Sequence, residues 1–210
     1  YIFIIFVILC VEVDFCSVIN NVTDAQMRKM GWTNFNLEDL NFCINKFEIN
    51  TKERFCHFIS VLSYESPLGR FTEDNMNCSI YEGRRDLGNI QPGDGCKYKG
   101  VGYLLLTGRY MYQQFSNIMG DENIIKGFSY VSPKYPFSFC GFFWNKNNVS
   151  ALVDSAASIE RICKIFDGGI GVGCSKGVKK YYNKVFYKER WIKENGIEER
   201  LIITYSPKYQ

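Results

Sequence analysis

Two glutamates stand in unlike surroundings along the sequence, and the difference between them suggests acid–base chemistry. Glu65 ends an amphipathic segment, residues 52–65, at the edge of its apolar face and at the negative end of its helix dipole. Both effects disfavour an ionised carboxyl group. Glu82 lies instead in a polar, glycine-rich stretch beside Arg84 and Arg85, which favours the charged form. One protonated and one charged carboxyl is the pairing that glycosidic hydrolysis requires, although most exposed glutamates are only solvating charges.

Several other kinds of chemistry are excluded by what the chain lacks. His57 is the single histidine, so a site with several histidine ligands is impossible and a Ser–His–Asp triad would depend wholly on it. The chain has two glycine-rich loops, residues 81–102 and 168–177, and neither contains a phosphate-binding pattern. The net charge is only +3 and the basic residues are scattered, which argues against nucleic-acid binding. We therefore expect no metal, no cofactor and no nucleic-acid partner.

The apolar spacing predicts a mostly helical chain, and no strand pattern stands out. Residues 52–65 place Phe55, Phe58, Ile59 and Leu62 on one face of a helix that Pro67 and Gly69 would end. Residues 81–102 are expected to form a loop or a set of short turns, because they contain six glycines. The expected helices cover residues 25–32, 37–47, 52–65, 103–117, 150–166 and 179–191.

The N-terminus begins with an apolar run, residues 1–11, which is too short to span a bilayer core of about 30 Å. We interpret residues 1–17 as a secretory signal peptide that starts inside its apolar core, with cleavage near Cys16–Ser17. A buried core strand is the alternative. The signal interpretation predicts a secreted protein with no membrane association in its mature form.

Nine cysteines in 210 residues, none of them in a C-x-x-C pair, fit disulfides better than zinc if the protein is secreted. The sequence does not determine the connectivity. Two pairs would brace the glycine-rich loops: Cys78–Cys96 around Glu82, and Cys163–Cys174 after the late helix.

Four stretches of the sequence together resemble glycoside hydrolase family 19, in its compact chitinase and endolysin-like branch. They are FISVLSYES (58–66), YEGRRDLGNIQPGDGCKYKGVGYLLLTGRYMY (81–112), FFWNKNNVSALVD (142–154) and IFDGG (165–169), followed by YY (181–182). The long block 81–112 is the most specific. The resemblance implies a mainly α, lysozyme-like two-lobed domain with a substrate cleft. We expect this catalytic domain over residues 18–190 and a tail of unassigned role over residues 191–210.

The resemblance also implies roles for individual residues. Glu65 matches the general acid and Glu82 the general base of an inverting mechanism, which needs carboxyl groups roughly 6.5–9.5 Å apart. Thr107 matches the hydroxyl that helps to hold the attacking water. The substrate-binding residues would include Tyr98, Tyr103 and Asp167, whereas core packing is favoured for Trp144. The expected substrate is chitin, cleaved at its β-1,4 N-acetylglucosamine linkages by a monomeric enzyme.

Five positions depart from the family pattern. Tyr64, Val101, Leu105, Met111 and Asp167 stand where the family usually has His, Arg, Gln, Asn and Asn. Apolar side chains at such positions would leave polar partners unpaired in a cleft. Two alternatives to a chitinase therefore stay open: a peptidoglycan hydrolase acting on the same kind of backbone, and a chitinase-like protein that binds sugar without cleaving it.

Overall fold

Helices supply nearly all the regular structure in residues 18–166 and 176–182, the part of the chain that this computed structural model describes. Within those ranges, β-structure is limited to isolated bridges. The α-helices are α1 (Asp24–Met30), α2 (Leu37–Lys46), α3 (Lys52–Glu65), α4 (Asp94–Lys97), α5 (Arg109–Met119), α6 (Phe128–Lys134), α7 (Pro136–Lys146), α8 (Val149–Asp154) and α9 (Ile159–Phe166), and residues 176–182 are also helical. Short 3-10 helices are η1 (Pro67–Gly69), η2 (Cys78–Tyr81), η3 (Arg85–Leu87) and η4 (Glu122–Lys126). The prediction of a mainly α fold is confirmed.

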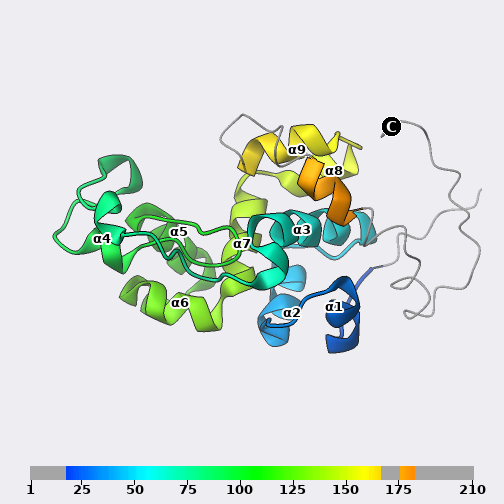
Figure 1. Cartoon of the computed structure of the whole chain (residues 1–210), viewed down its shortest axis with the longest axis horizontal. Coiled ribbons are helices and arrows are strands. Elements are labelled where there is room, and N and C mark those ends of the chain that lie inside the picture. The colour runs from blue at the N-terminus through cyan, green and yellow to red at the C-terminus, as the bar shows by residue number, and fades with distance from the viewer. Residues whose placement is uncertain (1–17, 167–175, 183–210) are drawn as a thin grey trace, which may run out of the picture.

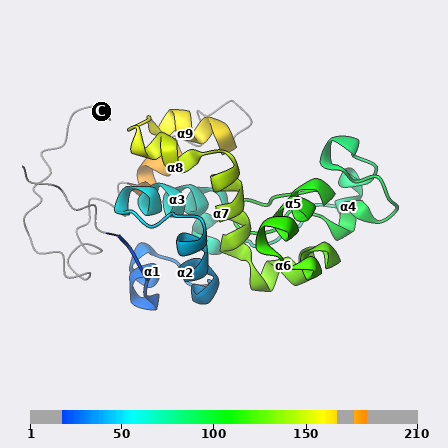
Figure 2. The ribbon, with the colours of Figure 1, turned by 180° about the vertical axis from the view of Figure 1, so that it is seen from behind.

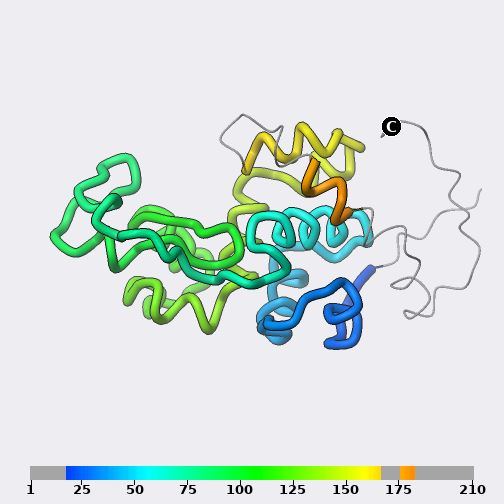
Figure 3. The backbone as a smooth tube through the Cα atoms, in the orientation of Figure 1, coloured from blue at the N-terminus to red at the C-terminus, as the bar shows by residue number. Residues whose placement is uncertain are grey.

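The helices form two lobes joined by α7 (Figure 1). One lobe contains α1, α2, α3, α8 and α9, and the other contains α4, α5 and α6; the view from behind gives the same division (Figure 2). After α3 the chain crosses from the first lobe to the second, as the backbone tube shows (Figure 3). This is the two-lobed arrangement that the sequence led us to expect.

The first three helices begin where the sequence supplies capping side chains. The Thr23 hydroxyl accepts the Gln26 N–H, and the Gln26 side chain accepts the Thr23 N–H in return, which makes a capping box at the start of α1. At the start of α2 the Asn36 side chain accepts the Asp39 N–H. At the start of α3 the Thr51 hydroxyl accepts the Arg54 N–H. These three predicted helices are confirmed.

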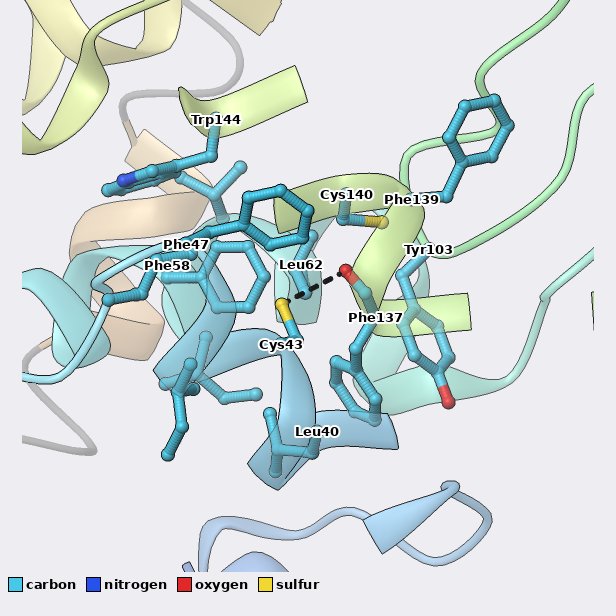
Figure 4. Packing of buried hydrophobic residues seen from close by; sticks show 14 of the residues in the cluster. Leu40, Cys43, Phe47, Phe58, Leu62, Tyr103, Phe137, Phe139, Cys140 and Trp144 are labelled. Carbon is cyan, nitrogen blue, oxygen red and sulfur yellow. Dashed lines mark hydrogen bonds between the residues drawn. The ribbon is translucent and has the colours of Figure 1, made fainter. Parts of the chain in front are cut away.

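The core is built around α7, whose aromatic side chains are buried on several sides of the helix (Figure 4). Phe137, Phe139 and Trp144 are fully buried. The carboxylate of Asp39, on α2, accepts the backbone N–H groups of Phe137 (2.6 Å) and Ser138 (3.0 Å) and so caps α7 from the neighbouring helix. The core thereby fixes the element that joins the two lobes.

Three predicted helices differ from those observed. The helix expected over residues 103–117 begins only at Arg109, because residues 101–106 turn back on themselves through the Val101–Leu106 bridge. The helix expected over 150–166 is divided into α8 and α9, with Ala156 at φ 54° in the break. Of the helix expected over 179–191, residues 179–182 are helical and the remainder lies outside the described residues.

The cysteines divide into one disulfide and four thiols in the described part of the chain. The predicted Cys78–Cys96 bridge is present. Cys163 is a buried free thiol here, so the expected pairing with Cys174 is not supported; Cys174 itself lies outside the described residues. Cys43, Cys56 and Cys140 are likewise free and buried. None of the described helices is long and apolar enough to cross a membrane.

Candidate active site

Glu65 is the last residue of α3, as the sequence predicted, and its surroundings fix its position. Its Oε1 atom is buried. The next residue, Ser66, ends the helix, and its hydroxyl both accepts the Phe71 N–H (2.9 Å) and donates to the Phe71 carbonyl. The turn after α3 is therefore closed by one buried side chain, which holds the Glu65 backbone at the end of the first lobe.

Glu82 directly follows η2, in the second lobe. It is exposed, and its two carboxylate oxygens accept the backbone N–H groups of Gly93 and Gly95, each at 2.7 Å. The Cys78–Cys96 disulfide closes the same segment just beside these contacts. These bonds hold the Glu82 carboxylate in one orientation against the start of α4.

The two glutamates therefore belong to different lobes. Glu65 ends α3, whereas Glu82 lies against α4, and both views place α4 at the end of the molecule away from α3 (Figures 1 and 2). The separation of the two carboxyl groups that inversion requires remains a prediction.

Thr107 lies beside a carboxylate that the sequence analysis did not select, that of Asp74. The segment after α3 pairs with the segment before Thr107, since the Asp74 N–H donates to the Gly100 carbonyl (2.8 Å) and the Gly102 N–H to the Thr72 carbonyl (2.9 Å). A Cβ on Gly100 would lie 3.0 Å from Thr107 Oγ1 and 3.1 Å from Asp74 Cβ. The hydroxyl expected to hold water and the Asp74 side chain are thus neighbours.

Asp74 itself is buried and tied into the second lobe. Its Oδ2 atom accepts the Tyr81 hydroxyl at 2.5 Å, and its Oδ1 atom accepts the Met76 N–H. The hydrogen bond to Asp74 raises the pKa of Tyr81 to about 12, so the phenol stays a donor. In the sequence, Asp74 is only one of two adjacent acids in a segment without periodicity, and the pairing with residues 100–102 is what makes it a candidate.

Both aromatic residues expected to bind substrate, Tyr98 and Tyr103, lie in the core. Tyr98 and Trp144 are fully buried and Tyr103 is 1% exposed, its ring packed between Trp32 (5.0 Å) and Phe137 (4.5 Å). The packing role favoured for Trp144 is confirmed. Asp167 lies outside the described residues.

An exposed aromatic residue that the sequence analysis missed is Tyr110, in the first turn of α5. Its side chain is 54% exposed, and its ring packs on Gly88. A Cβ on Gly88 would come 2.5 Å from the ring, and Gly88 has φ 74°, so only glycine fits beneath it. The glycine backbone supports one side of the ring, a suitable platform for the apolar face of a sugar.

The departures from the family pattern have different structural settings. Val101 is fully buried, and Met111 is half-buried against the core. Leu105 adopts φ 50° in the turn before α5. Tyr64 packs against Gly177 of the helix at residues 176–182. At Val101, an apolar residue therefore suits its surroundings.

Comparisons with known proteins are informative at the level of structure. No family model matches the sequence, and no curated protein matches it. Chitinase C from Streptomyces griseus superposes with a TM-score of 0.64 at 15% identity, covering 82% of this chain and 76% of that one. The class IV family 19 chitinase from Zea mays gives 0.63 at 17% identity, covering 80% and 92%.

A bacterial family 19 chitinase gives a TM-score of 0.60 at 14% identity, covering 79% of this chain and 95% of that one. All three similarities extend over both lobes, because each covers about four fifths of the chain. The fold is therefore that of a mainly α, lysozyme-like, two-lobed domain. Among such domains, this chain has the fold of the family 19 chitinases, which confirms the resemblance seen in the sequence.

Proposed function

We propose that the protein is a chitinase-type glycosidase that hydrolyses β-1,4 linkages between N-acetylglucosamine units. The observation that carries the proposal is the shared fold with three family 19 chitinases, combined with Glu65 at the end of α3 where the sequence motif requires the acid. The exposed ring of Tyr110 is consistent with a sugar-binding surface on the second lobe.

In the proposed mechanism, Glu65 donates its proton to the glycosidic oxygen as the bond to the anomeric carbon breaks. A second carboxylate takes a proton from water, and the water oxygen attacks the anomeric carbon from the opposite face, so the configuration inverts. The resemblance assigns the second role to Glu82. The geometry favours Asp74 as another candidate, because Asp74 is the carboxylate beside Thr107.

The remaining features of the proposal concern the mature protein. We propose that residues 1–17 are removed as a signal and that residues 18–190 form the catalytic domain of a secreted monomer, with a tail over 191–210. The Cys78–Cys96 disulfide supports an oxidising compartment.

A sugar-binding protein without turnover is the second candidate function. The observation in its favour is that apolar residues at Val101 and Met111 replace hydrogen-bonding ones, and Val101 is packed in the core. Such a protein would hold chitin oligomers in the same fold without completing the acid–base network.

The experiment compares turnover of N-acetylglucosamine hexamer and of peptidoglycan by the wild-type chain, Glu65→Gln and Glu53→Gln. Loss of the acid should lower turnover by about 10²–10⁴-fold while hexamer binding persists. Glu53 is exposed in the first turn of the same helix, so Glu53→Gln should leave turnover unchanged. Cleavage of peptidoglycan but not of the hexamer would show that peptidoglycan is the substrate. Binding of the hexamer without turnover by the wild-type chain would show that the protein binds sugar without cleaving it.

A further inference from the structure

A groove lies where the loop before α2 faces α6, between the two lobes. Its volume is about 540 Å³, within the range of about 300–1,000 Å³ that is usual for small-molecule sites. Three parts of the chain supply most of its walls: the loop before α2 with Asn34 and Asn36, the segment after α3 with Glu73, and α6 with Phe128 and Ser129. Tyr103 and, at the start of α7, Pro136 complete the lining. A ligand in it would contact both lobes at once.

The groove and the candidate active site lie on opposite sides of the segment after α3. Glu73 bridges to Val101, so the backbone is extended there and neighbouring side chains point in opposite directions. Asp74 points toward Tyr81 and the Thr107 side of the segment, whereas Glu73 lines the groove. The groove is therefore separate from the residues proposed to carry out hydrolysis.

The charges at the groove cancel. Glu73 is the one ionisable carboxylate or ammonium among the described residues that line it, and Lys99 neutralises it through an ion pair of 3.1 Å. The Lys99 ammonium also lies 4.0 Å from the centre of the Phe128 ring, which holds both the ring and the pair in place. A groove without net charge suits an uncharged ligand.

The other lining groups indicate what kind of uncharged ligand. Asn34 offers a side-chain amide and Ser129 a hydroxyl, while Phe35 and Phe128 offer flat apolar surfaces. The Asn36 amide is already engaged, because it caps α2 and donates to the Pro133 carbonyl. A pyranose ring has the matching pattern, with apolar C–H groups on its faces and hydroxyl or N-acetyl groups at its rim. The groove between α2, α5 and α7 has about 480 Å³ but is bordered by Lys46 and Lys146, and so lacks this neutrality.

We propose that the groove between the loop before α2 and α6 is a second carbohydrate site, which binds a short neutral oligosaccharide away from the catalytic groups. That the sugar is N-acetylglucosamine rests on the proposed function. A polysaccharide bound both in the groove and at the catalytic groups would keep the enzyme on an insoluble polymer between cleavage events. Binding at one site raises the local concentration of the polysaccharide at the other.

The test is an NMR titration of the full chain carrying Glu65→Gln with N-acetylglucosamine tetramer. Binding in the groove should shift the backbone amide signals of Asn34 and Ser129 with one common dissociation constant. That constant should differ from the one obtained from residues near Tyr110. Phe128→Leu keeps an apolar side chain but removes the ring, and should weaken binding in the groove about tenfold. Phe42→Leu, at a 46% exposed phenylalanine that does not line the groove, should leave both dissociation constants unchanged.

The outcomes separate this proposal from the proposed function. Shifts at Asn34 and Ser129 that weaken in Phe128→Leu support the groove site even if the wild-type chain proves to have no turnover. The site is rejected if tetramer saturates the region around Tyr110 while the groove amides stay in place, even if turnover is normal. Phe128→Leu that binds as tightly as its parent likewise rejects the site; the amide spectrum of each variant shows whether it is folded.

Discussion

Gly95 lies directly against Glu82, and no larger residue could take its place. The Gly95 N–H donates to Glu82 Oε2 at 2.7 Å, and a Cβ on Gly95 would come 2.6 Å from the Glu82 backbone nitrogen. With the Gly93 N–H on the other oxygen and the Cys78–Cys96 disulfide beside it, this contact joins two segments of the second lobe. The position of Glu82 thus depends on glycine at residue 95.

Gly95→Ala should therefore cost more stability than an ordinary glycine substitution. The new methyl group must displace the Glu82 backbone, so we expect a loss of about 2–3 kcal/mol in the free energy of unfolding. Gly120→Ala is the control: Gly120 is required for its φ of 65° and not by a close contact, since nothing lies within 4 Å of its Cβ position, and its substitution should cost only about 1 kcal/mol. Urea denaturation measures both. Equal losses in the two variants would contradict the close contact described here.

The second prediction concerns which carboxylate is the general base, Asp74 or Glu82. Replacing each of them by its amide distinguishes the two candidates. Whichever carboxylate activates the water, replacing it by its amide should lower turnover by about 10²–10⁴-fold, and azide should partly restore product formation. Asp74→Asn and Glu82→Gln are compared on the same N-acetylglucosamine hexamer. If azide restores product formation only in Asp74→Asn, Asp74 and not Glu82 is the general base. If azide restores it only in Glu82→Gln, Glu82 keeps that role.

The helices that the sequence predicts well are those with one apolar face and a capping residue. Residues 52–65 have both features, and α3 covers the same range. The helix α7 was missed for the opposite reason, because it is buried on most sides and residues 136–146 therefore lack a repeating apolar stripe. The helix α6 was missed because it is only seven residues long and contains Pro133.

The candidate site shows the same division between local and distant information. The position of Glu65 at a helix end follows from local spacing alone. The Asp74–Thr107 neighbourhood instead depends on two segments about thirty residues apart lying side by side, with Gly100 between them. No periodicity in the sequence encodes that pairing, and neither acid in the segment after α3 was recognised for this reason. Likewise, residue type alone does not predict that Tyr103 is buried against Phe137 of α7 and Tyr98 against Tyr112 of α5.

The third prediction concerns the Cys78–Cys96 disulfide, which closes a segment with a sequence separation of 18. Replacing both cysteines by serine should lower the free energy of unfolding by about 3 kcal/mol, through the added freedom of the unfolded chain. The double variant Cys56→Ser/Cys163→Ser is no suitable control, since both thiols are buried. The better comparison is the wild-type chain with and without reductant: reduction should reproduce the loss in the wild type and leave the double-serine variant unchanged.

The last prediction follows from the single histidine. His57 lies on α3 with its ring 4.5 Å from that of Tyr182, and its Nδ1 atom is buried with no hydrogen-bond partner among the described residues. Burial lowers the pKa of His57 to about 4, below the usual value of about 6.5. The folded protein therefore binds this proton less readily than the unfolded chain does. The stability that the neutral ring provides is present above pH 6.5 and is lost as the pH falls from there toward 4, by roughly 3 kcal/mol in all.

Asp39 acts in the opposite direction over part of that range, because burial raises its pKa to about 6. Its contribution to stability grows as the pH falls from 6 toward 4 and partly offsets that of His57. The two effects can be separated by substitution: His57→Phe keeps the ring and should remove most of the acid-induced loss, whereas Asp39→Asn should make that loss steeper. The direct measurement is an NMR titration of the imidazole, whose signal is unique because the chain has one histidine. A midpoint near pH 6.5 in the folded protein would show that the ring is open to water and would overturn the packing of residues 176–182 on α3.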